Sequence, residues 1–350
     1  MNLQDVAKRA GVASATVSRV LNGNPGVKNS TRMKVLRAVE ELKYQPNLHA
    51  RTLAGGRSRV LGVVRANLYN PFFADIYQAI ETNAVERGYE TVLENSSHDV
   101  KLLKASVHRL LGQKVAGLGV FSEMEPAILE DLQEARIPVV LFDAGEVTGS
   151  FTTIQFDHRK GIRTLLDLLH ALGHRRMAYV GAPLFLRPTE ERRLEFVETA
   201  ARHGADSVVV TPVEDGFAGG RQATRELLRS GFAPAAILCV NDWIAIGAIR
   251  ELRNQGLSVP GDVSVTGFDN ITMSEFSCPS LTTIHIPRAE IGRRVIAGLL
   301  PTLPALRPAR GISSWIRNWC CASRPGWPGS LTHSLPLIDS AVSNDRPART

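Results

Sequence analysis

The sequence is short of cysteine and of long apolar runs, and each shortage narrows what the protein can be. Its 350 residues contain four cysteines, with no Cys-x-x-Cys pair and no Cys/His spacing that suits a metal ion. No stretch of about 18 apolar residues occurs, so no membrane span is expected. Charged residues at Asp5, Lys8 and Arg9 interrupt the start of the chain, where a signal peptide needs an apolar run. We therefore expect a cytoplasmic protein.

The motifs of common enzyme classes are also missing. The chain has no Gly-x-Ser-x-Gly elbow for a nucleophilic serine, no Walker-type phosphate loop and no Gly-x-Gly-x-x-Gly fingerprint after a strand. The histidines show no ligand spacing and are most simply surface or helix residues, among them His98, His108, His158, His170 and His174. We predict that the protein is not an enzyme and needs neither a cofactor nor a metal. Its 44% hydrophobic and 21% charged residues are typical of a globular protein with room for two or three domains.

Residues 1–46 have the pattern of a small helical unit. Asn2 is placed to cap a first helix and Gly11 to end it. The apolar face of this helix comprises Leu3, Val6, Ala7 and Ala10. A second amphipathic pattern follows at once, and Asn29 is placed to cap a third helix. Two short helices joined by a tight glycine turn are typical of a helix-turn-helix, whose second helix enters the major groove of DNA.

Positive charge is concentrated in the same part of the chain. Residues 1–59 contain eleven Lys or Arg and three Asp or Glu, a balance of +8, whereas the whole chain carries +7. A positive field in this position favours a polyanion such as DNA as the partner. A solvated basic face on a small helical bundle is the alternative explanation.

From residue 60 onward, short apolar runs alternate with helical patterns. The expected strands are 60–64, 91–93, 117–121, 139–142, 177–180, 208–210, 237–240 and 263–267. The helical patterns between them include 72–87, 102–111, 162–172, 192–203, 221–229 and 245–255. This alternation predicts doubly wound parallel sheets. The two sets of strands predict two similar α/β lobes, with a ligand cleft at the carboxyl ends of their strands.

Short motifs follow one another along the chain. In the head they are Asp5-Val6-Ala7, Thr16-Val17-Ser18-Arg19-Val20-Leu21-Asn22, Tyr44-x-Pro46-Asn47 and Leu53-Ala54-Gly55. In the core they are Asn70-Pro71-Phe72-Phe73, Asn241-Asp242, Gly267-Phe268-Asp269 and Leu281-Thr282-Thr283-Ile284. In this order they resemble the LacI/GalR family of bacterial transcription regulators over about residues 2–299. The resemblance implies an all-α helix-turn-helix head at 1–46 and a hinge at 47–59. It also implies a periplasmic-binding-protein-like core of two lobes at 60–300, which binds the effector and dimerises.

The resemblance also implies how the head and hinge meet DNA. The implied contact residues are Ser14, Ala15, Thr16, Ser18, Arg19 and Asn22 in the head, and Ala50, Leu53 and Ala54 in the hinge. Ala15 offers a base edge only a methyl contact. Leu53 would be an apolar wedge between base steps of the minor groove, and a plain linker with a chance leucine is the alternative. Ala13 and Lys28 replace the serine caps usual in the family, and Asn29 is expected to cap in place of Lys28.

Seven residues are expected to bind the effector in the cleft. They are Phe72, Phe73, Asp143, Arg192, Phe217, Asn241 and Asp269, with Trp243 as a second aromatic platform. An aromatic platform with a few charged or amide groups suits a ring-shaped polar ligand, so we expect a carbohydrate, a sugar or a sugar phosphate. Asp269 has the alternative role of capping the next segment. Glu195 stands where the family usually has glycine, which leaves the local turn undefined.

The tail at 301–350 does not fit this pattern. It holds three of the four tryptophans and only two acidic residues, and no strand or helix period continues through it. The family implies a further strand of the second lobe here, and none is apparent. We favour a frameshift near residue 300 or a misassigned gene end over a genuine extension of low order.

The predicted function is a sequence-specific regulator of transcription, most simply a repressor. It would bind a near-palindromic double-stranded operator as a homodimer under the control of a small molecule. A periplasmic solute-binding protein shares the two-lobed core, but the missing signal peptide and the basic head argue against it. An α/β enzyme with a DNA-binding head is a further alternative, and no catalytic constellation supports it.

Overall fold

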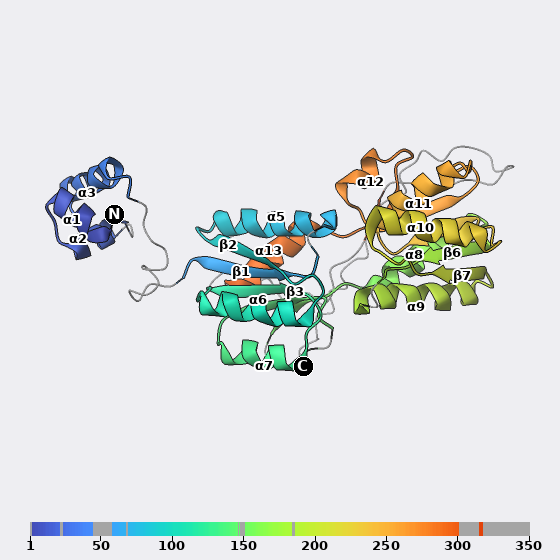
Figure 1. Cartoon of the computed structure of the whole chain (residues 1–350), viewed down its shortest axis with the longest axis horizontal. Helices are drawn as coiled ribbons and strands as arrows, with labels where there is room; N and C mark the ends of the chain where they lie inside the picture. Colours follow the sequence, from blue (N-terminus) through green and yellow to red (C-terminus); the bar gives the residue numbers. More distant parts are fainter. Residues whose placement is uncertain are drawn as a thin grey trace, which may run out of the picture.

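A helical head precedes two α/β lobes in the computed structural model of the protein (Figure 1). The structure describes residues 2–21, 24–44, 58–67, 69–145, 147, 151–183 and 186–300, together with a strand at 315–317. Among these residues, no helix combines the length and the apolarity that crossing a membrane requires.

The head contains α1 (Leu3–Ala10), α2 (Ser14–Leu21) and α3 (Asn29–Glu41). The side chain of Asn2 accepts hydrogen bonds from the amides of the first turn of α1, and Gly11 ends that helix at a φ of 64°, so both predicted caps are confirmed. The prediction that Asn29 caps α3 is wrong. Lys28 occupies the cap position, where its side chain accepts no hydrogen bond, and Asn29 is already the first helical residue.

The first lobe is built on a five-stranded parallel sheet in the order β2-β1-β3-β4-β5. Its strands are β1 (Val60–Arg65), β2 (Glu90–Asn95), β3 (Gly117–Phe121), β4 (Val139–Phe142) and β5 (Thr152–Ile154). Three of its helices are α5 (Pro71–Val85), α6 (Val100–Gly112) and α7 (Pro126–Glu134). Strand β5 was not predicted, because it has only three residues and two of them are exposed threonines.

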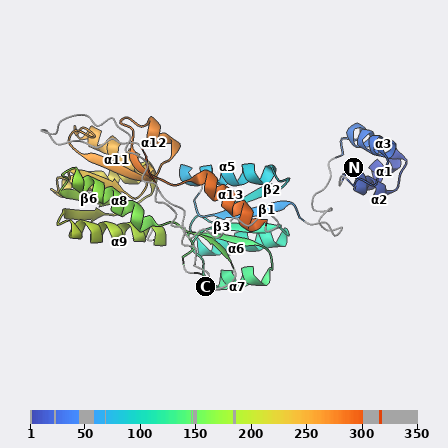
Figure 2. The same ribbon diagram turned by 180° about the vertical axis from the view of Figure 1, so that it is seen from behind.

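Helix α13 (Arg288–Leu299) returns to the first lobe after the chain has built most of the second. It lies beside α5 in the view from behind (Figure 2). Gly292 permits this approach, since a Cβ there would lie 2.6 Å from the Cβ of Ala79. The described chain therefore passes between the lobes at 155–157 and again at 286–287.

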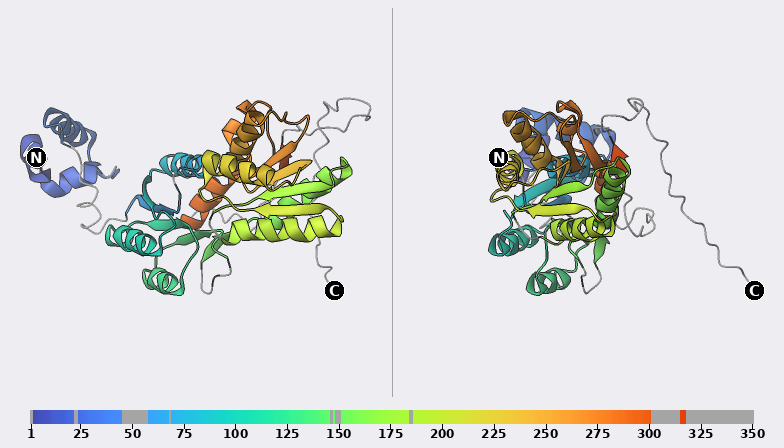
Figure 3. Two further views of the ribbon diagram at one scale, coloured as in Figure 1. Left: turned by 45° about the vertical axis from the view of Figure 1, so that its right-hand side comes forward. Right: turned by 90° about the vertical axis from the view of Figure 1, so that its right-hand side faces the viewer.

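The second lobe contains five parallel strands in the order β10-β9-β8-β6-β7. They are β6 (Arg176–Val180), β7 (Asp206–Val210), β8 (Ala236–Cys239), β9 (Ser264–Asp269) and β10 (Thr282–His285). Its helices are α8 (His158–Ala171), α9 (Arg187–Arg202), α10 (Gly216–Arg229), α11 (Asp242–Asn254) and α12 (Thr272–Phe276). Helices cover both faces of the sheet, as the turned views show (Figure 3). The predicted doubly wound fold of two lobes is confirmed.

A further strand, β11 (Trp315–Arg317), pairs antiparallel with β10 at the edge of the second sheet. The expectation that no strand follows residue 300 is therefore wrong. A strand of three residues is too short to show a periodic pattern, so the sequence did not indicate it. The rest of the tail and residues 47–57 of the predicted hinge lie outside the described residues. The interpretation of the tail as out of frame stays a prediction.

Candidate effector pocket and DNA-binding head

A pocket of about 190 Å³ lies between the lobes, at the carboxyl ends of strands from both sheets. Six of the seven predicted effector residues line it, namely Phe72, Phe73, Asp143, Arg192, Asn241 and Asp269. Phe217 does not line it. The ring of Phe217 packs edge-on against Trp243 instead, with ring centroids 5.8 Å apart, and Trp243 does not reach the pocket either.

Sequence reasoning missed several polar residues of the pocket wall. They are Asn67, Asn70, His98, Ser122, Glu123, Thr189 and Asp215. Asp215 caps α10 at the same edge of the sheet where Asn241 caps α11, through an oxygen that accepts from the Ile244 amide at 2.8 Å. An acidic or amide residue between a strand and a helix was therefore a usable signal for Asp215, as it was for Asn241.

Arg192 is the buried cation of the pocket. Its Nη1 donates to the backbone oxygen of Val240 at 2.6 Å, and its Cζ lies 3.8 Å from the ring centroid of Phe268. Its Nη2 lies 3.7 Å from Oδ1 of Asp269, an ion-pair distance that is too long for a direct hydrogen bond. The guanidinium is thus held from several sides and presents a fixed donor surface to the pocket.

Asp269 ends β9 and is almost fully buried, at 3% exposure. Its backbone has a φ of 109°, which aspartate rarely adopts, and its Oδ1 has no hydrogen-bond partner among the described residues. Burial raises the pKa of this carboxyl to about 8, although the charge of Arg192 opposes the shift. Asp269 therefore enters the neutral pH range largely protonated and offers a ligand a hydrogen-bond donor.

Asp143 follows β4 in the first lobe and contacts a histidine of the second. Its Oδ2 lies 3.1 Å from Nε2 of His158, which is the first residue of α8. His158 is a helix residue, as expected, but it is buried at 3% exposure and does not lie on the surface. The nearest sequence signal was Asp157, which caps α8 and fixes where the helix begins.

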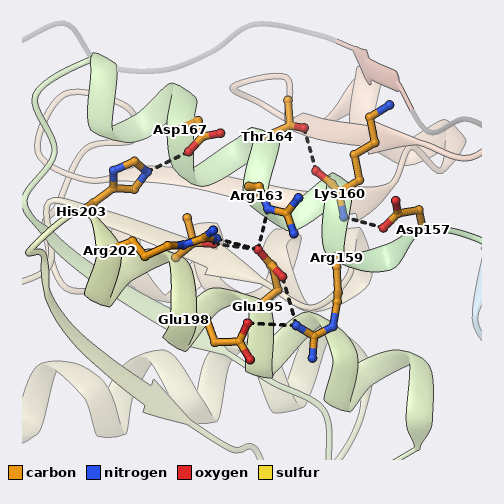
Figure 4. Close-up of polar contacts among 11 residues, drawn as sticks. Asp157, Arg159, Lys160, Arg163, Thr164, Asp167, Glu195, Glu198, Arg202 and His203 are labelled. Carbon is orange, nitrogen blue, oxygen red and sulfur yellow. Dashed lines mark hydrogen bonds and ion pairs between the residues drawn. The ribbon is translucent and has the colours of Figure 1, made fainter. Parts of the chain in front are cut away.

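Helix α9, which carries Arg192, is fixed to α8 by a buried carboxylate. Glu195 is 1% exposed and accepts from Arg163 at 2.8 Å, Arg202 at 3.0 Å and Arg159 at 3.2 Å (Figure 4). Burial alone would raise the pKa of Glu195, but the hydrogen bonds from Arg163 and other donors outweigh it and lower the pKa to about 2. Glu195, for which the sequence left the local turn undefined, thus lies within the regular helix α9 and connects it to α8.

In the head, α2 presents the predicted reading residues on one side and its core on the other. Val17 and Val20 are buried against α1 and α3, whereas Ala15 and Arg19 are exposed. Ser14, Thr16 and Ser18 are half-buried beside them. Asn22, Ala50, Leu53 and Ala54 lie outside the described residues. Contact of these residues with DNA stays a prediction.

Comparisons with known proteins bear on both parts of the molecule. Residues 2–47 match the bacterial regulatory proteins of the lacI family, and residues 166–312 match the periplasmic binding protein-like domain. Catabolite control protein A of Priestia megaterium is 32% identical over 296 residues, which cover 83% of this chain and 89% of that protein. The chain belongs to the LacI family.

Solved structures of similar proteins extend over both the head and the core. A lac repressor dimer bound to operator and the anti-inducer ONPF has a TM-score of 0.76 and 31% identity, and covers 86% of this chain and 92% of its own. The transcriptional regulator CelR in complex with cellobiose has a TM-score of 0.65 and 27% identity, with coverages of 91% and 98%. The predicted family and fold are confirmed, and so is the prediction of a DNA-binding regulator and not an enzyme, because the relatives are regulators.

Proposed function

We propose that this LacI-family chain is a dimeric, cytoplasmic repressor that binds a near-palindromic operator and responds to a sugar. Two heads related by a two-fold axis match two half-sites of a duplex. The similar lac repressor is a dimer on its operator, which supports the same assembly here. Ser14, Ala15, Thr16, Ser18, Arg19 and Asn22 would contact the major groove and its phosphates, and Ala50, Leu53 and Ala54 the minor groove.

The sugar assignment rests mainly on the acceptor-rich wall of the pocket. Carboxylates of Glu123, Asp143 and Asp215 line it together with the protonated carboxyl of Asp269 and one guanidinium, that of Arg192. Carboxylates accept hydrogen bonds from hydroxyl groups, and the excess of acids disfavours a phosphate. We therefore favour a neutral sugar over a sugar phosphate.

Aromatic side chains supply the second feature of a carbohydrate site. Phe72, Phe73, Phe121 and Phe142 line the same pocket, which therefore combines aromatic side chains with polar groups. CelR, a similar regulator, has been solved with cellobiose. The effector residues we assign are Phe72, Phe73, Asp143, Arg192, Asn241 and Asp269.

The coupling of the two sites would follow from the two-lobed architecture. The pocket draws its residues from both lobes, so a bound effector favours one arrangement of the lobes over another. The first lobe follows the hinge directly along the chain, and a change in its position alters the spacing of the two heads. Effector and operator then affect each other's affinity by the same factor.

A thermal-stability screen tests the proposal. The full-length protein is melted with D-galactose, D-ribose, cellobiose, a hexose 6-phosphate and adenine, and a ligand at 100 times its Kd should add about 2.7 kcal/mol of stability. A sugar that stabilises the protein should lose this effect in Asp269→Ala, while that variant keeps its affinity for DNA. Stabilisation by adenine or by the phosphate alone would replace the neutral-sugar assignment, and a fully responsive Asp269→Ala would displace the assigned pocket.

A further inference from the structure

His158 bridges two pocket residues that belong to different lobes. Its Nε2 lies 3.1 Å from Oδ2 of Asp143, at the end of β4 in the first lobe. Its Nδ1 lies 3.3 Å from both Nε and Nη2 of Arg192, on α9 of the second lobe. Among the hydrogen bonds and ion pairs of the described residues, none joins Asp143 to Arg192 directly. The polar connection between them therefore passes through the imidazole.

The chemistry of the two partners fixes the state of the ring. A guanidinium has only donors, so the Nδ1 that faces Arg192 must carry a lone pair. The proton of a neutral imidazole then sits on Nε2, where it is donated to the carboxylate of Asp143. The ring is enclosed, with the Phe156 and Phe268 ring centroids each 6.0 Å away. One tautomer satisfies both neighbours, and a flipped or protonated ring satisfies only one.

The bridge continues on the side of the second lobe. Arg192 also donates to the Val240 backbone, next to Asn241, and lies at ion-pair distance from Asp269. The pocket residues of the second lobe are thus connected to Asp143 of the first through a single neutral ring. A ligand hydroxyl that bonds Asp143 or Arg192 competes with His158 for the same atoms.

We propose that His158 is a positioning residue that couples Asp143 of the first lobe to Arg192 of the second, so that occupation of the pocket changes the bridge and with it the arrangement of the first lobe. The inference rests on the proposed effector site for its link to DNA binding. The bridge itself is a property of the protein without ligand. The bridge and its effect on DNA binding are therefore tested by separate measurements.

The tautomer is measured directly in the full-length dimer. Nitrogen-15 chemical shifts of the His158 side chain, assigned by comparison with His158→Phe, should show a protonated Nε2 and an unprotonated Nδ1 at neutral pH. A proton on Nδ1, or on both nitrogens, would overturn the proposal because Arg192 then has no acceptor on the ring.

A mutant cycle measures whether energy passes through the ring. Asp143→Asn and Arg192→Gln are made singly and together, in the wild-type background and in His158→Phe, which keeps an aromatic ring without its polar atoms. In the wild-type background the two substitutions should be non-additive by at least about fivefold in the unfolding equilibrium constant. In His158→Phe they should be additive within about twofold. Equal non-additivity in both backgrounds, or additivity in both, would reject the coupling role.

Two further variants cover the case in which His158→Phe folds poorly. His158→Asn places an amide near the Nδ1 position and His158→Gln places one near the Nε2 position. Each variant retains one half of the bridge, so both should abolish the non-additivity. His203→Gln is the matched control. His203 contacts Asp167 at 2.8 Å across the same pair of helices but away from the pocket (Figure 4), so its loss should leave the non-additivity of Asp143 and Arg192 unchanged.

The functional consequence is measured with a duplex that the protein selects from a random DNA pool. The sugar that stabilises the wild-type protein should change its DNA affinity by about fivefold or more. In His158→Phe this change should fall below about twofold, while the affinity for the sugar itself stays within about tenfold. A variant that retains the full response would overturn the inference. If no sugar affects the wild-type protein, the sugar assignment fails and the tautomer and the mutant cycle alone decide the role of His158.

Discussion

Arg288 donates through Nη1 to the backbone oxygen of Asp269 at 2.7 Å and thereby ties the first helix residue after the second crossover to the end of β9. The Nε of the same guanidinium lies 3.1 Å from Oδ2 of Asp75 on α5. One arginine thus connects a first-lobe helix with the backbone of a pocket residue in the second lobe. The side chain of Asp269 is held in the pocket by this contact and by the fold of β9, and not by hydrogen bonds of its own Oδ1.

The burial of Asp269 should make stability fall with rising pH. The pKa of the carboxyl is about 8 in the folded protein, against about 4 in an unfolded chain. The folded state therefore retains a proton that the unfolded state releases between about pH 4 and pH 8, so the free energy of unfolding decreases as pH rises through that window. Asp269→Asn removes the titrating group. The free energy of unfolding of this variant relative to that of the wild type should therefore rise by at least about 1 kcal/mol between pH 5 and pH 8.

Urea unfolding at several pH values measures this gain, and Asp206→Asn serves as the control. Asp206 is exposed and pairs with Arg176 at 3.1 Å on the surface. A parallel pH dependence of the wild type and Asp269→Asn would mean that Asp269 is solvated and ionised in the fold.

Glu195 predicts the opposite pH trend. Because its pKa is lowered to about 2 in the folded protein, its contribution is present above about pH 4.5 and is lost as pH falls toward 2. Glu195→Gln leaves three arginines without their shared carboxylate and should cost about 2–3 kcal/mol at pH 7, a gap that narrows in acid. Glu198→Gln is the matched control. Among the described residues this exposed carboxylate pairs with Arg159 alone, so its replacement should cost less than about 1 kcal/mol.

The difference between these residues shows what a sequence can and cannot predict. Asn2 and Gly11 act on neighbours close in the chain, and their caps were readable from local spacing. Glu195 and its partner Arg159 are 36 residues apart, and their contact exists only once two helices have packed. No periodicity records such a pair.

In the pocket, too, the local sequence predicts some residues and not others. Asp143, Asn241 and Asp269 were found because strand ends meet at one edge of a parallel sheet. The prediction that Phe217 lines the pocket was wrong. A position at the start of a helix near the cleft does not determine the direction of the side chain, and the Phe217 ring packs against Trp243. His158 carried no signal, since its role depends on one residue from each lobe.

Arg65 is a buried cation whose replacement should stabilise the protein. It is 2% exposed, and its Nη2 donates a hydrogen bond to the backbone oxygen of Asn67. Its Nε and Nη1 have no hydrogen-bond partner among the described residues, and its Cζ lies 4.5 Å over the ring of Phe73. Burial lowers its pKa to about 9, so it still carries its charge at neutral pH. Arg65→Met should raise the free energy of unfolding by about 1–4 kcal/mol in urea titrations.

Arg176→Met is the control for this experiment, because Arg176 lies 4.8 Å over the ring of Phe232 at the surface and pairs with Asp206. Its removal should change stability little. A large loss of stability in Arg65→Met would show that the contacts of Arg65 with Asn67 and Phe73 outweigh the cost of burying its charge. Since Phe73 lines the pocket, a loss of sugar affinity in a stabilised variant would mark Arg65 as a residue kept for ligand binding.

The head should bind DNA with a strong dependence on salt. Its +8 charge in residues 1–59 predicts a loss of at least about tenfold in affinity for a selected duplex between 50 and 200 mM salt. Leu53→Ala should weaken this specific binding more than binding to random DNA, because it removes an apolar wedge and leaves the charges in place. Fluorescence anisotropy with both duplexes measures the two losses. Nearly salt-independent binding would contradict the electrostatic account, and equal losses on both duplexes would reject the wedge.

Strand β11 makes a prediction about where the chain can be cut. It pairs with β10 in the register Thr283 to Arg317 and His285 to Trp315, and so covers the backbone edge of a buried strand. A chain that ends at residue 317 should keep the stability of the full protein. A chain that ends at residue 300 should lose about 1–3 kcal/mol, because the backbone bonds of β10 to β11 are removed and the edge is exposed.

Urea unfolding and light scattering of the two truncated chains decide between the two interpretations of the tail. If the tail is out of frame, residues 315–317 pair with β10 only through their backbone. Restoring the frame should then make the second lobe clearly more stable than it is in the chain of 317 residues. The reason is that each buried apolar side chain of a native strand contributes about 1.5–3 kcal/mol. If the tail is native, the restored frame should bring no gain. Equal stability and solubility of the chains of 300 and 317 residues would show that β11 contributes nothing, which is the result expected of a sequence that was never selected to close this sheet.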